Sequence, residues 1–194
     1  SNDTELVLVN LELVGGEINT YPNVPKGGAV LVEENSRLTA KKVKFVGNTA
    51  QSGGFAVHLK QNAIFNCTDC VFSGNKWRSK ASANNGFFGT IGGFGIGGLY
   101  LRNCHFIDNV AWNEQGGAIG VKLYRLVGGK GPRDNEGVVL ENCIFQNNRA
   151  RIGGAVYFGH ASKAIVKNCT FFNNNATSGD GGGIFIDNGV SHGS

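Results

Sequence analysis

The chain has 194 residues, a formal net charge of +4 at pH 7, 31 glycines and no methionine. The glycines lack the Gly-X-Y register of collagen, and no apolar run is long enough to cross a bilayer as a helix. We see no signal peptide, and from the lack of such a run we expect no direct membrane span in this segment. We expect residues 1–194 to form one domain. Because the chain has no starting methionine, we expect this domain to be part of a longer surface protein.

Short predicted strands repeat along the chain. The opening segment, residues 4–16, is typical of an imperfect first repeat, in which Leu11 and Leu13 stand where later repeats have Cys and Phe. A Phe-x-x-Asn motif then recurs at residues 45–48, 72–75, 106–109, 145–148 and 171–174. A glycine pair followed by apolar residues begins at residues 27, 53, 116, 153 and 181. These two motifs define an internal repeat, which sets the architecture.

The repeat length favours a β-solenoid. Successive motif phenylalanines are 27, 34, 39 and 26 residues apart, so the two longer steps indicate insertions, at residues 76–95 and 122–137. A period in the middle twenties is too short for two packed helices but fits several short strands with their corners. The leucine-rich consensus is absent, and the repeats are rich in Gly, Asn, Val, Phe and Thr rather than in helix formers. We therefore predict an all-β parallel β-helix of about six coils.

Alignment on the motif phenylalanine predicts the core. Side chains alternate along a strand, and equivalent residues of neighbouring coils lie one strand spacing apart, so like residues stack on like. The change of alternation three residues before the phenylalanine predicts a bend there, at positions such as Asn103, Asn142 and Asn168. One predicted stack contains Phe45, Phe72, Phe106, Phe145 and Phe171. The stack two residues earlier contains Val43, Cys70, Cys104, Cys143 and Cys169.

The most regular polar column consists of Asn48, Asn75, Asn109, Asn148 and Asn174. Such side chains could be ligands for a sugar or for calcium. They could instead form a ladder whose amides bond to one another and to the main chain at a tight corner. We favour the structural ladder. The glycine-rich segment 92–98 lacks the lysine and the strand-to-helix context of a phosphate loop, so we expect no nucleotide cofactor.

The stacked cysteines leave two alternatives open. Neighbouring coils are close enough for a disulfide between Cys70 and Cys104 or between Cys143 and Cys169. Free thiols that pack as small hydrophobic side chains fit equally well, and we favour them because parallel stacked side chains rarely reach disulfide torsions. Cys67 and Cys70 form a lone CxxC with no second pair, so we expect no zinc site, and no other metal or cofactor.

Phe-x-x-Asn together with Gly-Gly-Ala-Ile/Val in one repeat resembles the chlamydial polymorphic outer membrane proteins, over residues 27–186. The resemblance implies a right-handed β-helix displayed by an autotransporter, at the outer cell surface or outside the cell. It implies adhesion to host cells or a passive surface role. The third repeat departs from this pattern, because residues 76–98 contain no Gly-Gly-Ala-Ile at the usual distance. We therefore expect a non-enzymatic adhesin passenger or structural surface protein, able to stack end to end.

The two insertions are the expected places for partner binding, because loops carry recognition more often than the scaffold does. Their aromatic and arginine side chains, of the types that anchor interfaces, are Trp77, Arg78, Tyr124 and Arg125. The alternative is that these side chains pack on neighbouring coils. We expect the partner to be a host or neighbouring surface protein or a glycan. The basic clusters at 41–44 and 76–80 lack the regular columns that nucleic acid binding needs.

The alternative function is a β-helix enzyme that binds or cleaves polysaccharides. Such a site needs carboxylates that converge on one face, whereas Asp69 and Asp108 occupy different positions of the repeat. The four histidines also fall at unrelated positions. Four Asn-x-Ser/Thr sequences occur, and in a eukaryotic secreted protein Asn175 would be the expected glycosylation site.

Overall fold

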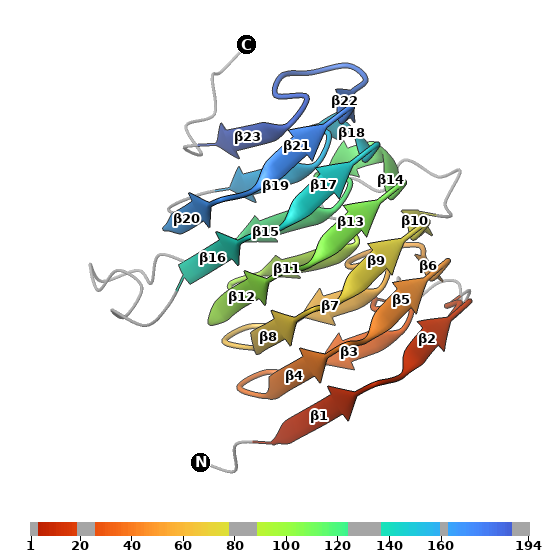
Figure 1. The fold of residues 1–194 in the computed structure, drawn as a ribbon, viewed down its shortest axis with the longest axis vertical. Coiled ribbons are helices and arrows are strands. Elements are labelled where there is room, and N and C mark those ends of the chain that lie inside the picture. Colours follow the sequence, from red (N-terminus) through yellow and green to blue (C-terminus); the bar gives the residue numbers. More distant parts are fainter. Residues whose placement is uncertain (1–3, 19–25, 78–88, 124–136, 160–162, 188–194) are drawn as a thin grey trace.

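A computed structural model describes residues 4–18, 26–77, 89–123, 137–159 and 163–187. The described chain consists of strands, turns and bends, and its strands form four parallel sheets that wind around one axis. Figure 1 shows the coils stacked from the N-terminal to the C-terminal end. The prediction of a parallel β-helix of about six coils is confirmed. Within the described residues no helix is long and apolar enough to span a membrane.

Each coil contributes one strand to each sheet, except that the first coil has no strand in sheet C. Sheet A contains β1 (Glu5–Val9), β4 (Arg37–Lys41), β8 (Ile64–Thr68), β12 (Gly98–Arg102), β16 (Gly137–Glu141) and β20 (Ala164–Lys167). Sheet B contains β2 (Glu12–Val14), β5 (Lys44–Val46), β9 (Val71–Ser73), β13 (His105–Ile107), β17 (Ile144–Gln146) and β21 (Thr170–Phe172).

The other two sheets close the coil. Sheet C contains β6 (Thr49–Ala50), β10 (Lys76–Trp77), β14 (Val110–Gln115), β18 (Arg149–Ile152) and β22 (Asn175–Ala176). Sheet D contains β3 (Val30–Val32), β7 (Val57–Leu59), β11 (Ile91–Phe94), β15 (Ile119–Lys122), β19 (Val156–Gly159) and β23 (Ile184–Asp187). In the first coil, Glu17 makes a single bridge to Thr49 in place of a sheet C strand.

The corners are made by residues with positive φ. Between sheets A and B these include Asp69, Asn103 and Asn142, at φ of 53 to 56°. Asn and Asp tolerate this left-handed conformation better than other residues with a side chain, which explains the predicted bend. At the corner between sheets C and D, Gly116 has a φ of 73° and a Cβ there would collide with the carbonyl of Ile119. The glycine pairs of the sequence therefore mark a corner that excludes side chains.

The core follows the predicted columns. Leu13 pairs with Phe45, and Phe65 pairs with Leu99, so the register is the one expected from the alignment. The third repeat, which lacks the Gly-Gly-Ala-Ile motif, still forms β11, where Ile91 pairs with Ile119. A second, smaller core lies inside sheet C and consists of Ala50, Phe55, Trp77, Ala111 and Ala150.

Candidate recognition surface

The five motif asparagines form one continuous hydrogen-bonded ladder inside the corner between sheets B and C. The Nδ2 of Asn75 donates to Oδ1 of Asn109 at 2.9 Å and to the carbonyl oxygen of Phe45 at 3.0 Å. The main-chain N–H of Asn75 donates to the same Oδ1 at 3.1 Å. The same pattern repeats from Asn48 to Asn174. Because the solenoid itself uses these donors and acceptors, the ladder is a structural element rather than a ligand site.

The motif phenylalanines stack face to face through the whole core. Ring centroids of neighbouring coils are 4.6 to 4.9 Å apart, with interplanar angles of 6° or less. Isolated aromatic pairs prefer offset or edge-to-face contacts, so the coil spacing imposes this arrangement. Phe45, Phe72, Phe106 and Phe145 are fully buried, and Phe171 of the last coil is half-buried.

All five cysteines are free thiols. The Sγ atoms of Cys67 and Cys104 are 3.9 Å apart, and the Sγ of Cys70 completes a group within 4.8 Å. The third sulfur, from Cys104, comes from the next coil, which the CxxC spacing could not reveal. Burial raises the pKa of Cys67, and hydrogen bonds from Cys104 and Cys67 lower the pKa of Cys70. These thiols are buried in the closed core, where they pack as small apolar groups.

The structure corrects the expectation for Trp77. Its side chain is 5% exposed and belongs to the smaller core, and its indole N–H donates to the carbonyl oxygen of Gln51 at 2.9 Å. Inward alternation along β10 explains this burial, because the preceding Lys76 points outward. Trp77 is therefore a packing residue. Arg78, Tyr124, Arg125 and most of the two insertions lie outside the described residues.

Sheet C instead presents a different tryptophan. In β14 the register with β18 shifts between Ala111 and Gln115, which pair with Ala150 and Ile152, so β14 contains a bulge. Bulges redirect side chains, and here Trp112 is 48% exposed. The guanidinium carbon of Arg149 lies 4.4 Å from the centroid of the Trp112 ring. This cation–π contact holds the exposed indole against the scaffold.

Two buried atoms without hydrogen bonds and one carboxyl group with a raised pKa accompany Trp112 and Arg149 on the described strands β14 and β18. Within the described part of the chain, the side-chain Oε1 of Gln115 and Nε of Arg149 are buried and have no hydrogen-bond partner. Glu114 is 6% exposed, and burial raises its pKa to about 7, an effect that the charge of Arg151 partly offsets. A buried polar group without a hydrogen bond lowers the free energy of unfolding by about 1–3 kcal/mol. A contribution to stability therefore does not explain why these groups are present. We call Trp112, Glu114, Gln115, Arg149 and Arg151 the bulge cluster.

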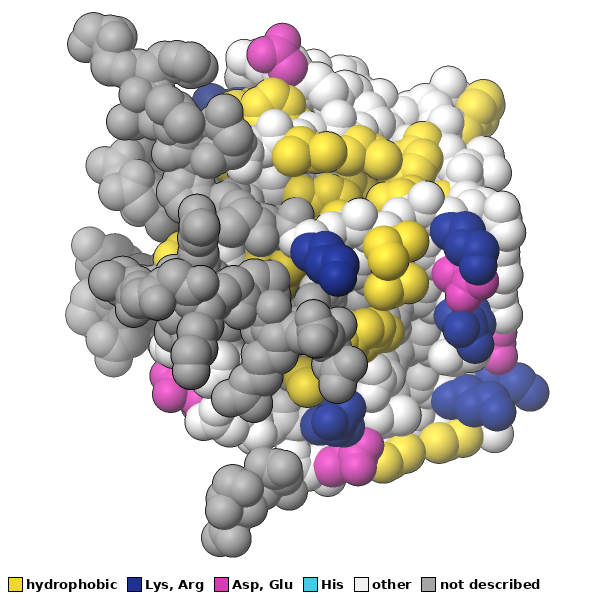
Figure 2. All heavy atoms as spheres, turned by 90° about the vertical axis from the view of Figure 1, so that its left-hand side faces the viewer, with side chains coloured by type: hydrophobic (Ala, Val, Ile, Leu, Met, Phe, Trp, Pro, Cys, Tyr) yellow, Lys and Arg dark blue, Asp and Glu magenta, His cyan; other side chains and the backbone are white. Residues whose placement is uncertain are grey.

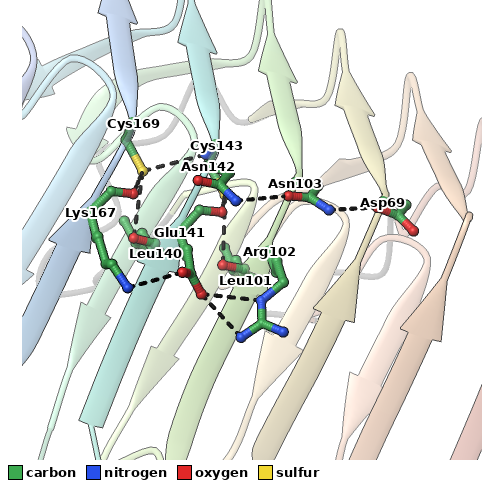
Figure 3. A network of polar contacts seen from close by, with 10 residues as sticks. All are labelled: Asp69, Leu101, Arg102, Asn103, Leu140, Glu141, Asn142, Cys143, Lys167 and Cys169. Atoms are coloured by element: carbon green, nitrogen blue, oxygen red, sulfur yellow. Dashed lines mark hydrogen bonds and ion pairs between the residues drawn. The ribbon is translucent and has the colours of Figure 1, made fainter.

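The acidic residues weighed for catalysis have structural partners. Figure 3 shows Asn142 donating to Asn103, and Asn103 donating to Asp69, at 3.2 and 2.9 Å. Asp108 lies at the next corner of the coil, where it accepts from Asn147 at 3.0 Å. The two aspartates therefore belong to separate exposed ladders, and they do not form the pair of carboxylates that glycoside hydrolysis needs.

Charged side chains on sheet A form ion pairs across coils. Glu141 accepts from Arg102 at 3.0 Å and from Lys167 at 3.2 Å (Figure 3). Hydrogen bonding and the charge of Lys167, followed by Arg102, lower the pKa of Glu141. Exposed ion pairs such as those of Glu141 contribute little to stability.

The side of the molecule that faces left in Figure 1 has an interrupted hydrophobic patch, with acidic and basic side chains along one border (Figure 2).

Asn175 lies on the surface at the start of β22, where it pairs with Arg149. Its side chain is exposed, so the position is accessible. Whether it carries a glycan stays a prediction.

The chain's fold has a family match. Residues 17–193 match the family described as right-handed β-helix region. The chain belongs to this right-handed β-helix family. The predicted right-handed β-helix is therefore confirmed. The predicted resemblance to polymorphic outer membrane proteins and autotransporters is also confirmed, by two relatives of the chain.

Two curated relatives are named as a probable autotransporter and a probable outer membrane protein. The chain is 29% identical over 191 residues to "Probable autotransporter YfaL" of Escherichia coli, covering 85% of this chain and 14% of the relative. It is 30% identical over 167 residues to "Probable outer membrane protein PmpD" of Chlamydia trachomatis, covering 82% of this chain and 10% of the relative. The chain thus spans about a seventh and a tenth of these proteins. No solved structure matches the chain significantly.

The bulge cluster was not among the residues expected to bind a partner, although the sequence contains a signal for it. The glycine pair begins five residues after the ladder asparagine at Asn48 and at Asn148, but seven residues after Asn109 and after Asn174. Two extra residues at this corner must leave the sheet, because the coils before and after remain in register. The spacing therefore marks this corner as variable in length, at residues 110–116 and again in the last coil.

Proposed function

We propose that this chain is a non-enzymatic segment of a surface-displayed passenger, in which a rigid solenoid holds an adhesive surface on sheet C. The right-handed β-helix family and the two surface-protein relatives support a passenger scaffold at or near the outer surface. The adhesive role goes beyond those comparisons, and the bulge cluster supports it.

A rigid scaffold requires contacts that continue from each coil to the next. The asparagine ladder and the phenylalanine stack run through every coil from the second to the sixth, so each coil is tied to its neighbours by the same contacts. In a solenoid, stability is the sum of such nearest-neighbour contacts. A surface on one sheet is therefore held at a fixed distance and orientation, as an adhesive segment requires.

The exposed Trp112 is the observation that carries the adhesive part. Large aromatic side chains are enriched at interfaces, and Arg149 fixes the orientation of this one. Among the exposed large hydrophobic side chains of the described residues, Trp112 alone belongs to a sheet C strand. An isolated aromatic anchor among polar groups suits reversible contact with a polar surface better than burial in a permanent interface.

Adhesion can be tested with beads coated with the purified chain. We expect them to bind eukaryotic cells or bacterial cells, and we expect Trp112→Ala to reduce binding at least tenfold. Phe172→Ala is the matched control, because Phe172 is an aromatic residue with 55% exposure on sheet B. Absence of binding to both cell types would contradict the adhesive role and leave a passive scaffold. Release of reducing ends from a polysaccharide panel would contradict the non-enzymatic role.

A further inference from the structure

We propose that the bulge cluster is a binding site for an acidic glycan, in which Trp112 stacks on a sugar ring and Arg149 binds its carboxylate or sulfate group. This inference rests on the proposed adhesive function and names the ligand class of the same surface.

The contact with Trp112 leaves N–H donors of the Arg149 guanidinium group available for an anion. The guanidinium carbon of Arg149 lies over the Trp112 ring, 4.4 Å from its centroid, and the contact is made to the π face of the indole. The N–H donors of a guanidinium lie in its plane, so a stacked arginine can still bind an anion through two parallel hydrogen bonds. Among the described residues Arg149 has no ion pair. Its charge is therefore not already neutralised by a carboxylate of the scaffold.

The charge of the surrounding surface favours an anion. The described strands of sheet C contain three cations, Lys76, Arg149 and Arg151, and a single acid, Glu114. The raised pKa of Glu114 means that this acid is only partly ionised near neutral pH. Sheet C therefore attracts acidic ligands, in contrast to sheet A, where Glu141 pairs with two cations.

The two polar atoms without partners match a hydroxyl-rich ligand. Arg149 Nε is a donor without an acceptor, and Gln115 Oε1 is an acceptor without a donor. A sugar hydroxyl both donates and accepts, so one ring can satisfy both atoms. Both atoms are buried in the structure, so their pairing with a sugar requires a local shift of the bulge-cluster side chains on binding.

The size of the exposed patch favours a glycan over a folded protein. A stable protein interface buries about 800 Å² on each partner, with several aromatic or arginine anchors at its centre. The described part of sheet C offers a single exposed aromatic ring, flanked by charged and amide side chains. One ring with adjacent polar groups is enough to bind a single sugar unit.

The test compares two probes by calorimetry: a heparin-derived oligosaccharide, and the same oligosaccharide after desulfation and carboxyl reduction. We expect the intact chain to bind the acidic probe at moderate salt and to bind the neutral probe at least tenfold more weakly. Trp112→Ala and Arg149→Lys should each weaken binding at least tenfold, because lysine keeps the charge but loses the planar fork. Unfolding curves for each variant check that the fold is intact.

Lys41→Ala is the matched control for charge, because Lys41 is an exposed cation on sheet A. It should change binding less than twofold. Diffuse electrostatic attraction would leave Arg149→Lys unchanged, because lysine keeps the charge, and either that result or an equal loss in Lys41→Ala and Arg149→Ala would overturn the site. Binding unaffected by Trp112→Ala would also overturn it. If the beads adhere to cells but the acidic probe does not bind, the ligand class is wrong while the adhesive function stands.

Discussion

The side-chain oxygen of Asn148 accepts two hydrogen bonds from Asn109, one from its Nδ2 at 2.9 Å and one from its main-chain N–H at 3.3 Å. Both residues are fully buried. One amide therefore satisfies two donors of the neighbouring coil, and its own Nδ2 bonds to coils on both sides. A side chain in this position cannot be lost from one coil without leaving unpaired groups in the coils next to it.

Asn109→Ala should lower the free energy of unfolding by about 3 kcal/mol or more, because it leaves the carbonyl oxygen of Phe72 and two donors of Asn75 buried without partners. Chemical denaturation measures this change. Asn66→Ala makes the same exchange on the outer face of β8, where Asn66 is half-buried, and should cost less than about 1 kcal/mol. Equal costs would mean that the ladder adds nothing.

Phe145→Ala should lower the free energy of unfolding by about 3–5 kcal/mol, as truncation of a fully buried phenylalanine usually does. The ring also contacts Phe106 and Phe171 on its two faces, so the cavity opens onto both neighbouring coils. The adjacent Ile144 is 36% exposed on the same strand, and Ile144→Ala should cost about 1 kcal/mol. Urea denaturation of both variants makes the comparison, and a harmless Phe145→Ala would contradict the core assignment.

The thiols should react in a fixed order with a thiol-specific reagent. Cys169 is half-buried, whereas Cys67, Cys70, Cys104 and Cys143 are buried, so Cys169 should be labelled first under native conditions. Burial raises the pKa of Cys169, so even this reaction should be slow at neutral pH. All five should react after unfolding in denaturant. Mass spectrometry identifies the labelled sites, and a mass lower by two hydrogens would reveal a disulfide instead.

Stability should fall as the pH drops from about 6.5 to about 3 because of His58. Burial, followed by the charges of Lys26 and Lys60, lowers its pKa from 6.5 to about 3. In that range the unfolded chain binds a proton that the folded chain excludes, so the folded state loses up to about 5 kcal/mol. Its Nδ1 accepts from the N–H of Gly54 at 3.2 Å, and asparagine can supply a similar acceptor. His58→Asn should lose less stability than the wild type between pH 7 and pH 4.

Glu114 should make the protein less stable as the pH rises, which is opposite to the effect of His58. Its pKa is raised from 4.5 to about 7, so between these values the unfolded chain ionises while the folded chain keeps its proton. Stability from this residue is present below pH 4.5 and is lost as the pH rises through 7. Glu114→Gln should therefore be more stable than the wild type at pH 8, by about 1–3 kcal/mol, and the difference should vanish at pH 4. Thermal unfolding at the two pH values checks this.

The sequence was enough to predict the solenoid, because equivalent residues of successive coils stack directly and the Phe and Asn columns are therefore visible as a repeat. It was not enough to place Trp77. The other coils have Ala50, Ala111 and Ala150 in that column, and their small side chains leave the space that the single large ring fills. A column of alanines gives no sign of whether a tryptophan in the same place points inward.

The grouping of Cys67, Cys70 and Cys104 was also not visible in advance. Cys67 lies in sheet A, while Cys70 and Cys104 lie at the corner toward sheet B, and a column alignment says nothing of distances between columns. The bulge cluster was missed for a related reason. Alignment treats extra residues as a gap, whereas in the fold they form the bulge that exposes Trp112.

The bulge in β14 begins and ends within one strand, since Ile119 again pairs with Val156 in β15. Residues can thus be added at this corner without shifting any core column of the next coil. In evolutionary terms, the coils of such a protein are free to change length and composition on sheet C while the selection that preserves folding acts on other positions. Related solenoids with the same core should therefore differ most in the length and composition of this face.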